Sequence, residues 1–173
     1  PYGSVSMLPV TYGYLLMLGA EGLKHVTEMA ILNANYLASS FEKLGFKILF
    51  KGKQGRVGHE MIWDCSAFNK EYGISELDIA KRLMDFGFHA PTLSFPVHGT
   101  LMVEPTESEP KEELDRFIEA LKTIREEMCE VAEGKADKTD NVLKNAPHTH
   151  KVLTADEWTH TYPRSKAAYP LPW

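Results

Sequence analysis

Cysteine is scarce in this chain, which has only Cys65 and Cys129 among its 173 residues. The two form no CxxC pair and have no zinc-ligand spacing, so we expect neither a disulfide framework nor a zinc site. Two inert thiols are typical of a protein from a reducing compartment. His148 and His150 lie close together, but no cysteine or acidic cluster accompanies them, so we expect no metal site.

The sequence also lacks a long apolar run and an excess of positive charge. No apolar stretch reaches the roughly 18 residues that a transmembrane helix requires, so we expect no membrane span. The formal net charge is −5, which argues against nucleic acid as a partner. A length of 173 residues, of which 43% are hydrophobic, suits one folded domain.

Apolar residues recur at helical spacing in several segments. These segments predict helices at residues 10–18, 20–44, 73–87 and 108–134. Ser75 and Ser108 are the predicted N-caps of the last two, because a serine oxygen accepts hydrogen bonds from free backbone N–H groups of the first turn. The predicted helix ends are Gly19, Gly45 and Gly87.

Short apolar segments bounded by turns predict the strands. They lie at residues 46–50, 58–65 and 100–104, with a further short one near 92–96. Because a turn or a single helix separates them, the sheet should be antiparallel or mixed. The fold class that follows is α/β (α+β), a two-layer sandwich in which a small, three- to four-stranded, mostly antiparallel sheet is covered by helices.

The two ends of the chain suggest a piece of a longer polypeptide. The first residue is Pro1 rather than methionine, and the chain finishes on the apolar "YPLPW". Residues 135–173 have no sustained period, which is uncommon for so long a stretch inside a compact domain. We predict a domain at residues 1–134 and an irregular tail at 135–173 that wraps over another part of a larger protein and packs poorly on this domain. Partial disorder of the tail is the alternative.

Several blocks of the sequence resemble one enzyme family. They are "YGSVSMLP", "GLKHVTEMAILNANYLA", "GHEMIWD", "AKRLMDFGFHAPTLSFPVHGTLMVEPTESEPKEELDRF", "NVLKNAPHTH" and "AAYPLPW". Together they are similar to the P protein of the glycine cleavage system, glycine dehydrogenase (decarboxylating), among the fold-type I pyridoxal-phosphate enzymes. The element order resembles the small C-terminal domain of that superfamily. The resemblance therefore makes residues 1–19 a linker and a short helix from the large domain.

The resemblance implies an activity, a cofactor and partners for the intact enzyme. Glycine loses its carboxylate as carbon dioxide while pyridoxal phosphate acts as the electron sink, and the aminomethyl group passes to the lipoyl arm of the H protein. The implied partners are the large pyridoxal-phosphate-binding domain, the H protein and a further subunit in a homo-oligomer or two-subunit assembly. The implied location is the bacterial cytoplasm, or the mitochondrial matrix in a eukaryote.

One departure from the family is plain. The family's Schiff-base lysine lies in an "HKT" block before a glycine-rich run, and this chain contains no such block. We therefore expect the chain alone to be inactive, with no catalytic residue of its own and no covalently bound pyridoxal phosphate. A stand-alone, non-catalytic interaction module of the same fold is the alternative. A serine hydroxymethyltransferase-like member would want an arginine where this chain has Met102.

The segment from Gly87 to Ser108 supplies the candidate residues that line the substrate site. They are His89, Thr92, His98, Met102 and Glu104. Many superfamily members carry, at the position that "LMVEPT" gives to Met102, an arginine that grips the substrate carboxylate. A carboxylate that leaves as neutral carbon dioxide gains nothing from strong pairing in the ground state, so an apolar residue suits decarboxylation. The other interpretation of Met102 is a core residue.

Weaker candidates lie elsewhere in the chain. Ser4 and Ser6 are placed near the cofactor phosphate by the resemblance, although turn chemistry alone explains them. Arg56 and His59 are candidates for facing the large domain, and a plain surface role is the alternative. The basic segment "KGKQG" with "RVGHE" could meet an acidic carrier surface or be a solvated loop.

Overall fold

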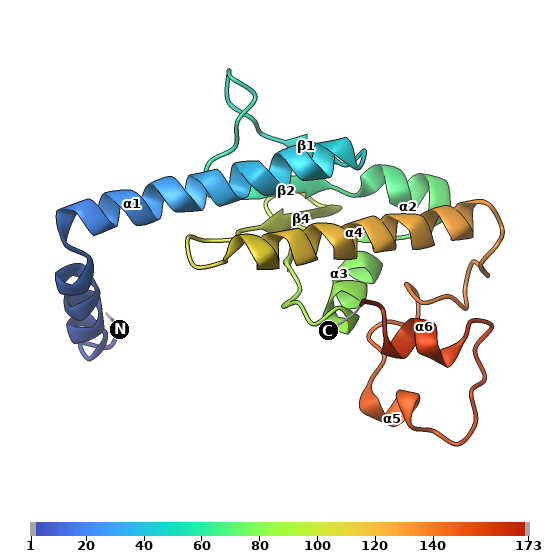
Figure 1. Ribbon diagram of the computed structural model, residues 1–173. Coiled ribbons are helices and arrows are strands. Elements are labelled where there is room, and N and C mark those ends of the chain that lie inside the picture. Colours follow the sequence, from blue (N-terminus) through green and yellow to red (C-terminus); the bar gives the residue numbers. More distant parts are fainter. Residues whose placement is uncertain (1–2, 172–173) are drawn as a thin grey trace.

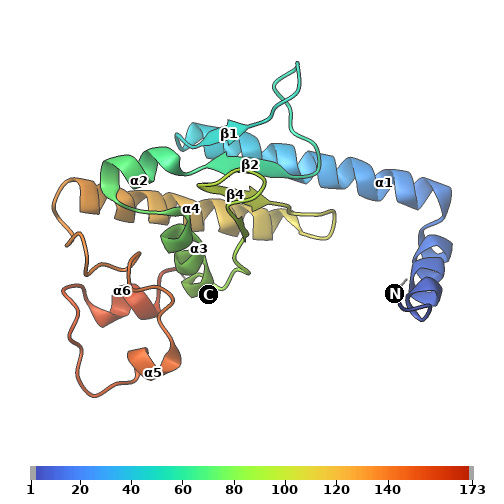
Figure 2. The ribbon, with the colours of Figure 1, turned by 180° about the vertical axis from the view of Figure 1, so that it is seen from behind.

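The computed structural model describes residues 3–171, within which four short strands form one antiparallel sheet in the order β1–β2–β4–β3. The strands are β1 (Lys47–Leu49), β2 (Met61–Asp64), β3 (Thr92–Leu93) and β4 (Thr100–Val103). The helices are α1 (Met7–Lys43), α2 (Ser66–Tyr72), α3 (Glu76–Asp85), α4 (Lys111–Ala132), α5 (His150–Leu153) and α6 (Arg164–Ala168). Helix α1 and the long helix α4 cover one face of the sheet, as the two opposite views in Figures 1 and 2 show. The predicted α/β (α+β) two-layer class is confirmed.

The core lies between this face of the sheet and the two long helices. Trp63 of β2 pairs with Leu101 of β4 in the register of the sheet, and both are fully buried. The Trp63 ring packs 4.5 Å from Phe46 and 5.7 Å from Phe41, measured between centroids. Cys65 is buried beside it, and burial raises the pKa of its thiol, so it is a poor nucleophile.

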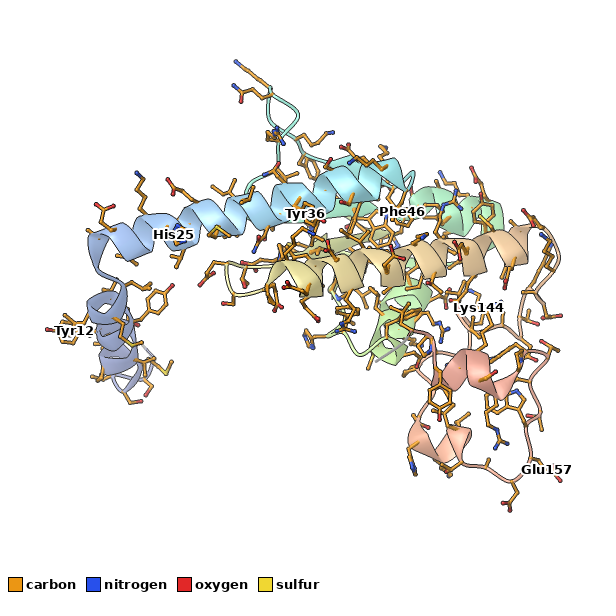
Figure 3. The ribbon with its side chains drawn as sticks, in the orientation of Figure 1. Tyr12, His25, Tyr36, Phe46, Lys144 and Glu157 are labelled. Carbon is orange, nitrogen blue, oxygen red and sulfur yellow. The ribbon has the colours of Figure 1, made fainter. Side chains whose placement is uncertain are left out.

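Helix α1 consists of two segments separated at Gly19. Gly19 has φ 61° and ψ −174°, a conformation that is strained for any residue with a Cβ atom. This confirms the two predicted helices and their boundary. The first segment begins at Met7, earlier than predicted, because Pro9 falls in the first turn, where no N–H donor is needed. That segment stands apart from the sheet and carries Tyr12 (Figures 1 and 3).

The cap of α3 agrees with the sequence and the cap of α4 does not. Ser75 and Asp78 form a reciprocal capping box at the start of α3, as predicted for Ser75. The N-cap of α4 is Pro110, so the prediction of Ser108 is wrong. Thr106 has a positive φ of 59° and accepts a hydrogen bond from the Ser108 backbone, which ties Ser108 into the preceding turn. Helix α2 was not predicted, because its seven residues are too few to establish a period.

The tail is mostly irregular, as predicted, with α5 and α6 as its short helices. Its expected poor packing on this domain is wrong for the described part, since Val142, Leu143, Ala146 and Ala167 are buried. Lys144 Nζ donates to Asp78 Oδ2 at 2.7 Å and to the Gly73 carbonyl, and thereby ties the tail to α3 (Figure 3). Tyr169 is exposed, and Trp173 lies outside the described residues. The division at residue 134 stays a prediction.

Across residues 3–171, no helix combines the length and the apolar character that crossing a bilayer requires.

Candidate functional site

A pocket of about 400 Å³ opens where β4 ends and α4 begins. Its walls come from α1, from the segment between α3 and β3, from the end of β4 and from the first turns of α4. The lining residues are Leu37, Gly87, Phe88, His89, Ala90, Pro91, Thr92, Met102, Val103, Glu104, Pro105, Glu109, Glu113, Leu114 and Phe117. The pocket thus brings together residues that are far apart in the sequence.

Four of the five residues predicted to line a substrate site lie around this pocket. Thr92 and Met102 are paired across β3 and β4, and Glu104 follows two residues after Met102. His89 comes from the segment that leads from α3 to β3. His98 does not line the pocket: β3 and β4 form a hairpin, and His98 is exposed in the turn between them.

The pocket wall is acidic. Glu104, Glu109 and Glu113 contribute carboxylates, and the described lining includes no lysine or arginine. Arg116 stands behind the wall, where its guanidinium binds both oxygens of Glu113 and donates to the Phe86 carbonyl at 2.7 Å. The hydrogen bonds from Arg116 lower the pKa of Glu113, so this carboxylate stays ionised. A ligand carboxylate therefore meets repulsion here rather than a cationic clamp.

Met102 is half-buried at the edge of this pocket. Its strand neighbours are Ile62 on β2 and Thr92 on β3, so the side chain sits in the middle of the sheet rather than at a free edge. The position is open enough to contact a ligand and apolar enough to serve as core. The geometry is compatible with both interpretations that the sequence raised.

Pyridoxal phosphate does not fit this wall by itself. Its phosphate requires positive charge or clustered N–H donors, and its aldehyde requires a lysine. The wall instead presents three carboxylates and one histidine as its charged or titratable groups. The described pocket residues can border a cofactor that is held by other groups, but they do not supply its anchor.

None of the weaker candidates lines the pocket. The Ser4 and Ser6 hydroxyls are 2.6 Å apart in an exposed turn before α1, a local contact typical of turn chemistry. Arg56 is exposed in the loop between β1 and β2. His59 lies two residues before β2, where its Nε2 is 3.9 Å from Glu104 Oε1 at the pocket wall.

A buried ion pair between Arg82 of α3 and Glu127 of α4 was not predicted from the sequence. Neither residue lines the pocket. Arg82 is completely buried, and it donates to the two oxygens of Glu127 at 3.0 and 2.6 Å. It also bonds Asp85 at 2.9 Å and the Lys166 carbonyl at 3.0 Å. Burial raises the pKa of Glu127, in opposition to the attraction of Arg82. The sequence did contain a signal for a buried ion pair, because the charged residue Arg82 lies on the apolar stripe of α3.

His148 extends this cluster into the tail. Its backbone N–H and its ring Nδ1 both bond Asp85, at 2.6 and 2.7 Å, and its Nε2 lies 2.7 Å from the Tyr162 hydroxyl. Burial raises the pKa of Tyr162 to about 12. These groups face one another and not the pocket. They hold the tail on α3 and α4.

Comparison with known proteins identifies the family. Residues 26–148 match the family model described as glycine dehydrogenase, C-terminal domain. Relatives named glycine dehydrogenase (decarboxylating) include one from Bacteroides fragilis strain YCH46, 58% identical over 171 residues, or 99% of this chain. Another, from Bdellovibrio bacteriovorus, is 56% identical over 173 residues, and one from Nostoc punctiforme is 55% identical over 173 residues, each over 100% of this chain.

The chain spans 18% of the length of each of these relatives. The matched region includes residues 26–43 of α1, the whole sheet, α2 to α4 and the first part of the tail. All the pocket residues lie within it. The chain therefore belongs to the family of glycine dehydrogenase C-terminal domains.

Proposed function

We propose that this chain is the C-terminal part of a pyridoxal-phosphate-dependent glycine decarboxylase, the P protein of the glycine cleavage system. The observation that carries the proposal is the match of residues 26–148 to the glycine dehydrogenase C-terminal domain. In this proposal, the chain forms one wall of the substrate site, and other parts of the enzyme hold the cofactor. Held by those other parts, pyridoxal phosphate would supply the electron sink for loss of the glycine carboxylate.

In this proposal, the pocket wall does not stabilise the carboxylate of the bound substrate. Met102 offers no charge to pair with it, and Glu104 and Glu109 repel it. Carbon dioxide is neutral, so this repulsion disappears as the carbon–carbon bond breaks. The difference lowers the barrier to decarboxylation, because the ground state is stabilised less than the transition state. His89 and Thr92 supply polar groups that orient the ligand.

The first segment of α1 supports a contact with the cofactor-binding part of the enzyme. Its apolar side chains are largely exposed, among them Leu8 at 64%, Leu16 at 65% and Met17 at 87%. Such a surface is costly in water, which indicates that it is covered in the working protein. We assign it to the large pyridoxal-phosphate-binding domain, with residues 1–19 as the connection between the two parts.

The remaining partners follow from the proposed reaction. The H protein brings a lipoyl arm that accepts the aminomethyl group, and a further subunit completes a homo-oligomer or a two-subunit assembly. A bacterial cytoplasm is the proposed location, which the bacterial relatives support.

The test is the exchange of labelled bicarbonate into the carboxyl group of glycine. The intact protein, with pyridoxal phosphate and H protein, should catalyse this exchange. Residues 1–173 alone should not, and borohydride treatment with the cofactor should label none of their lysines stoichiometrically. Lack of exchange by the intact, cofactor-loaded protein would leave the interaction module as the better description.

A further inference from the structure

Positive charge is concentrated in one short part of this acidic chain. Residues 46–59 contain Lys47, Lys51, Lys53 and Arg56 and no aspartate or glutamate. This stretch therefore carries +4, and with −5 for the whole chain the remaining residues carry −9. Such a concentration of positive charge in an acidic chain creates a positive electrostatic potential around this segment.

Three of these four charges stand on a loop that projects from the body of the domain, while Lys47 lies in β1 and pairs with Asp64. We call residues 50–57, between β1 and β2, the basic arm; it extends away from the helices in both views (Figures 1 and 2). Lys53 and Arg56 are exposed and form no ion pair with any residue of the described chain. Lys51 binds Glu42, which leaves Lys53 and Arg56 available to a partner.

The basic arm has a defined shape. At its base, Val57 is buried, and its backbone N–H and carbonyl are both bonded to the Asn35 side chain, at 3.0 and 2.9 Å. Near its tip, the Gly52 N–H bonds the Arg56 carbonyl at 2.8 Å, and the Gly55 N–H bonds the Gly52 carbonyl at 2.9 Å. A loop held by such bonds loses little conformational entropy when it binds a partner.

Phe50 adds an apolar anchor to the basic arm. Its side chain is 69% exposed, and its backbone has φ 56°, in the left-handed region that bulky residues rarely adopt. An exposed aromatic ring on strained backbone gains nothing from the fold itself. Both features are common in binding sites, where the aromatic ring supplies the contact area.

The basic arm is also connected to the pocket. The chain leaves the arm at Val57 and reaches His59, whose Nε2 lies 3.9 Å from Glu104 Oε1 on the pocket wall. A protein bound to the arm would thus stand beside the pocket and could place a flexible group into it.

We infer that the basic arm docks an acidic protein surface with an apolar spot for Phe50, and that this partner delivers its reactive group to the adjacent pocket. The inference rests on the proposed function, in which that partner is the carrier of the lipoyl arm. A nucleic acid fits less well, because its extended backbone is bound by a continuous basic face, and this chain concentrates its positive charge in one short stretch.

The test measures binding of the H protein from the same organism to the intact protein by titration calorimetry at two salt concentrations. The double variant Lys53→Glu/Arg56→Glu should weaken binding by about tenfold or more and flatten its salt dependence. Phe50→Ser should weaken it by roughly three- to tenfold and leave the salt dependence unchanged. The matched control Lys138→Glu/Lys151→Glu reverses two exposed tail charges and should change affinity less than about twofold.

Wild-type affinity in both arm variants, with thermal melting unchanged, would overturn the inference. Absence of H protein binding by the wild type would also overturn it. The same holds if the arm variants keep their affinity for the H protein and instead lose self-association or affinity for anionic vesicles. Bicarbonate exchange with free lipoic acid in place of the carrier separates the two proposals. If the wild-type protein does not catalyse this exchange, the proposed function is contradicted. If the arm variants still catalyse it, their defect is confined to docking.

Discussion

Met102 contributes to an acidic pocket wall, at the position where the resemblance to the fold-type I pyridoxal-phosphate enzymes implies that other members hold an arginine. The residue is half-buried, its strand neighbours are Thr92 and Ile62, and it lines the pocket. Its chemistry matters in this setting because the carboxylates around it already disfavour a bound carboxylate. A cation at this point would reverse that preference.

The substitution Met102→Arg in the intact enzyme should tighten glycine binding and slow decarboxylation. A guanidinium pairs with the carboxylate in the ground state, and that pairing is lost as carbon dioxide forms. If the pair contributes about 3 kcal/mol, the rate should fall by roughly a hundredfold. Apparent glycine affinity and bicarbonate exchange measure the two effects, and Met102→Leu is the apolar control. Changes below about twofold in a folded Met102→Arg enzyme would mean that Met102 is only a core residue.

Asp140 joins two parts of the tail. Its carboxylate accepts hydrogen bonds from His160 Nδ1 at 2.8 Å, from Asn145 at 2.7 Å and from the Thr161 N–H at 2.7 Å. Burial by itself would raise its pKa, but these bonds outweigh burial and lower the pKa to about 2.

The stability contribution of Asp140 should therefore disappear in acid. Its pKa in the unfolded chain is about 3.9, so the unfolded state binds more protons between pH 4 and pH 2. The contribution is complete above about pH 4 and is lost as the pH falls through 2. Because the side chain is 30% exposed, we expect only about 1 kcal/mol. Asp140→Asn should cost this amount at pH 7 and much less at pH 2, where the carboxylate is half protonated, in urea titrations; an equal cost at both would refute the assignment.

At the scale of elements, α3 connects the sheet domain to the tail. Arg82 of α3 donates hydrogen bonds to Glu127 of α4 and to Asp85 at the end of α3. Asp85 is in turn hydrogen-bonded to His148 of the tail. The tail has little regular structure, so these side-chain bonds and a few buried aliphatic residues are what hold it in place.

Glu127→Gln should destabilise the fold strongly. The change leaves the buried Arg82 guanidinium without its main counter-charge, and breaking one side of a buried pair costs about 3–5 kcal/mol. Urea unfolding should report this loss, and hydrogen exchange should show it first in residues 141–148 and 162–167. The neighbouring Glu126 is exposed, so Glu126→Gln should change stability by less than about 0.5 kcal/mol. Similar values for the two variants would mean that the ion pair contributes little.

At the scale of the whole molecule, exposed apolar surface is concentrated at the N-terminal end. The segment of α1 before Gly19 stands apart from the core, and its large side chains are exposed on several sides of the helix (Figure 3). No residue of the described tail covers it in either view (Figures 1 and 2). Eight of the 19 large apolar residues exposed in the described chain lie in this one short segment.

The isolated chain should therefore self-associate through this segment. Leu16→Gln with Met17→Lys should raise the monomer fraction in sedimentation velocity, because these side chains are among the most exposed of the set. Melting of the sheet domain should stay the same, since the segment contributes no residue to the core. Leu77→Gln, at an exposed apolar position on α3, serves as the control. A chain that is monomeric without these substitutions would contradict the expectation.

The local structure followed from the sequence alone. Helix periods, the Gly19 break, the Ser75 cap and the short apolar segments of β2 and β4 are short-range effects of backbone sterics and side-chain spacing, and they predicted the class of the fold. The block around Met102 likewise indicated four of the residues that line the pocket. Such features depend on neighbours within a few residues.

The tertiary structure decided the contacts between distant segments. The sequence could not place His98 outside the pocket, because the β3–β4 hairpin register sets where that turn points. It also gave no sign that the tail would be anchored on this domain, because the anchoring pairs are far apart in the sequence. Lys144 is 66 residues from Asp78, and His148 is 63 residues from Asp85. Burial makes such long-range polar pairs worth forming, and burial exists only once the helices have packed.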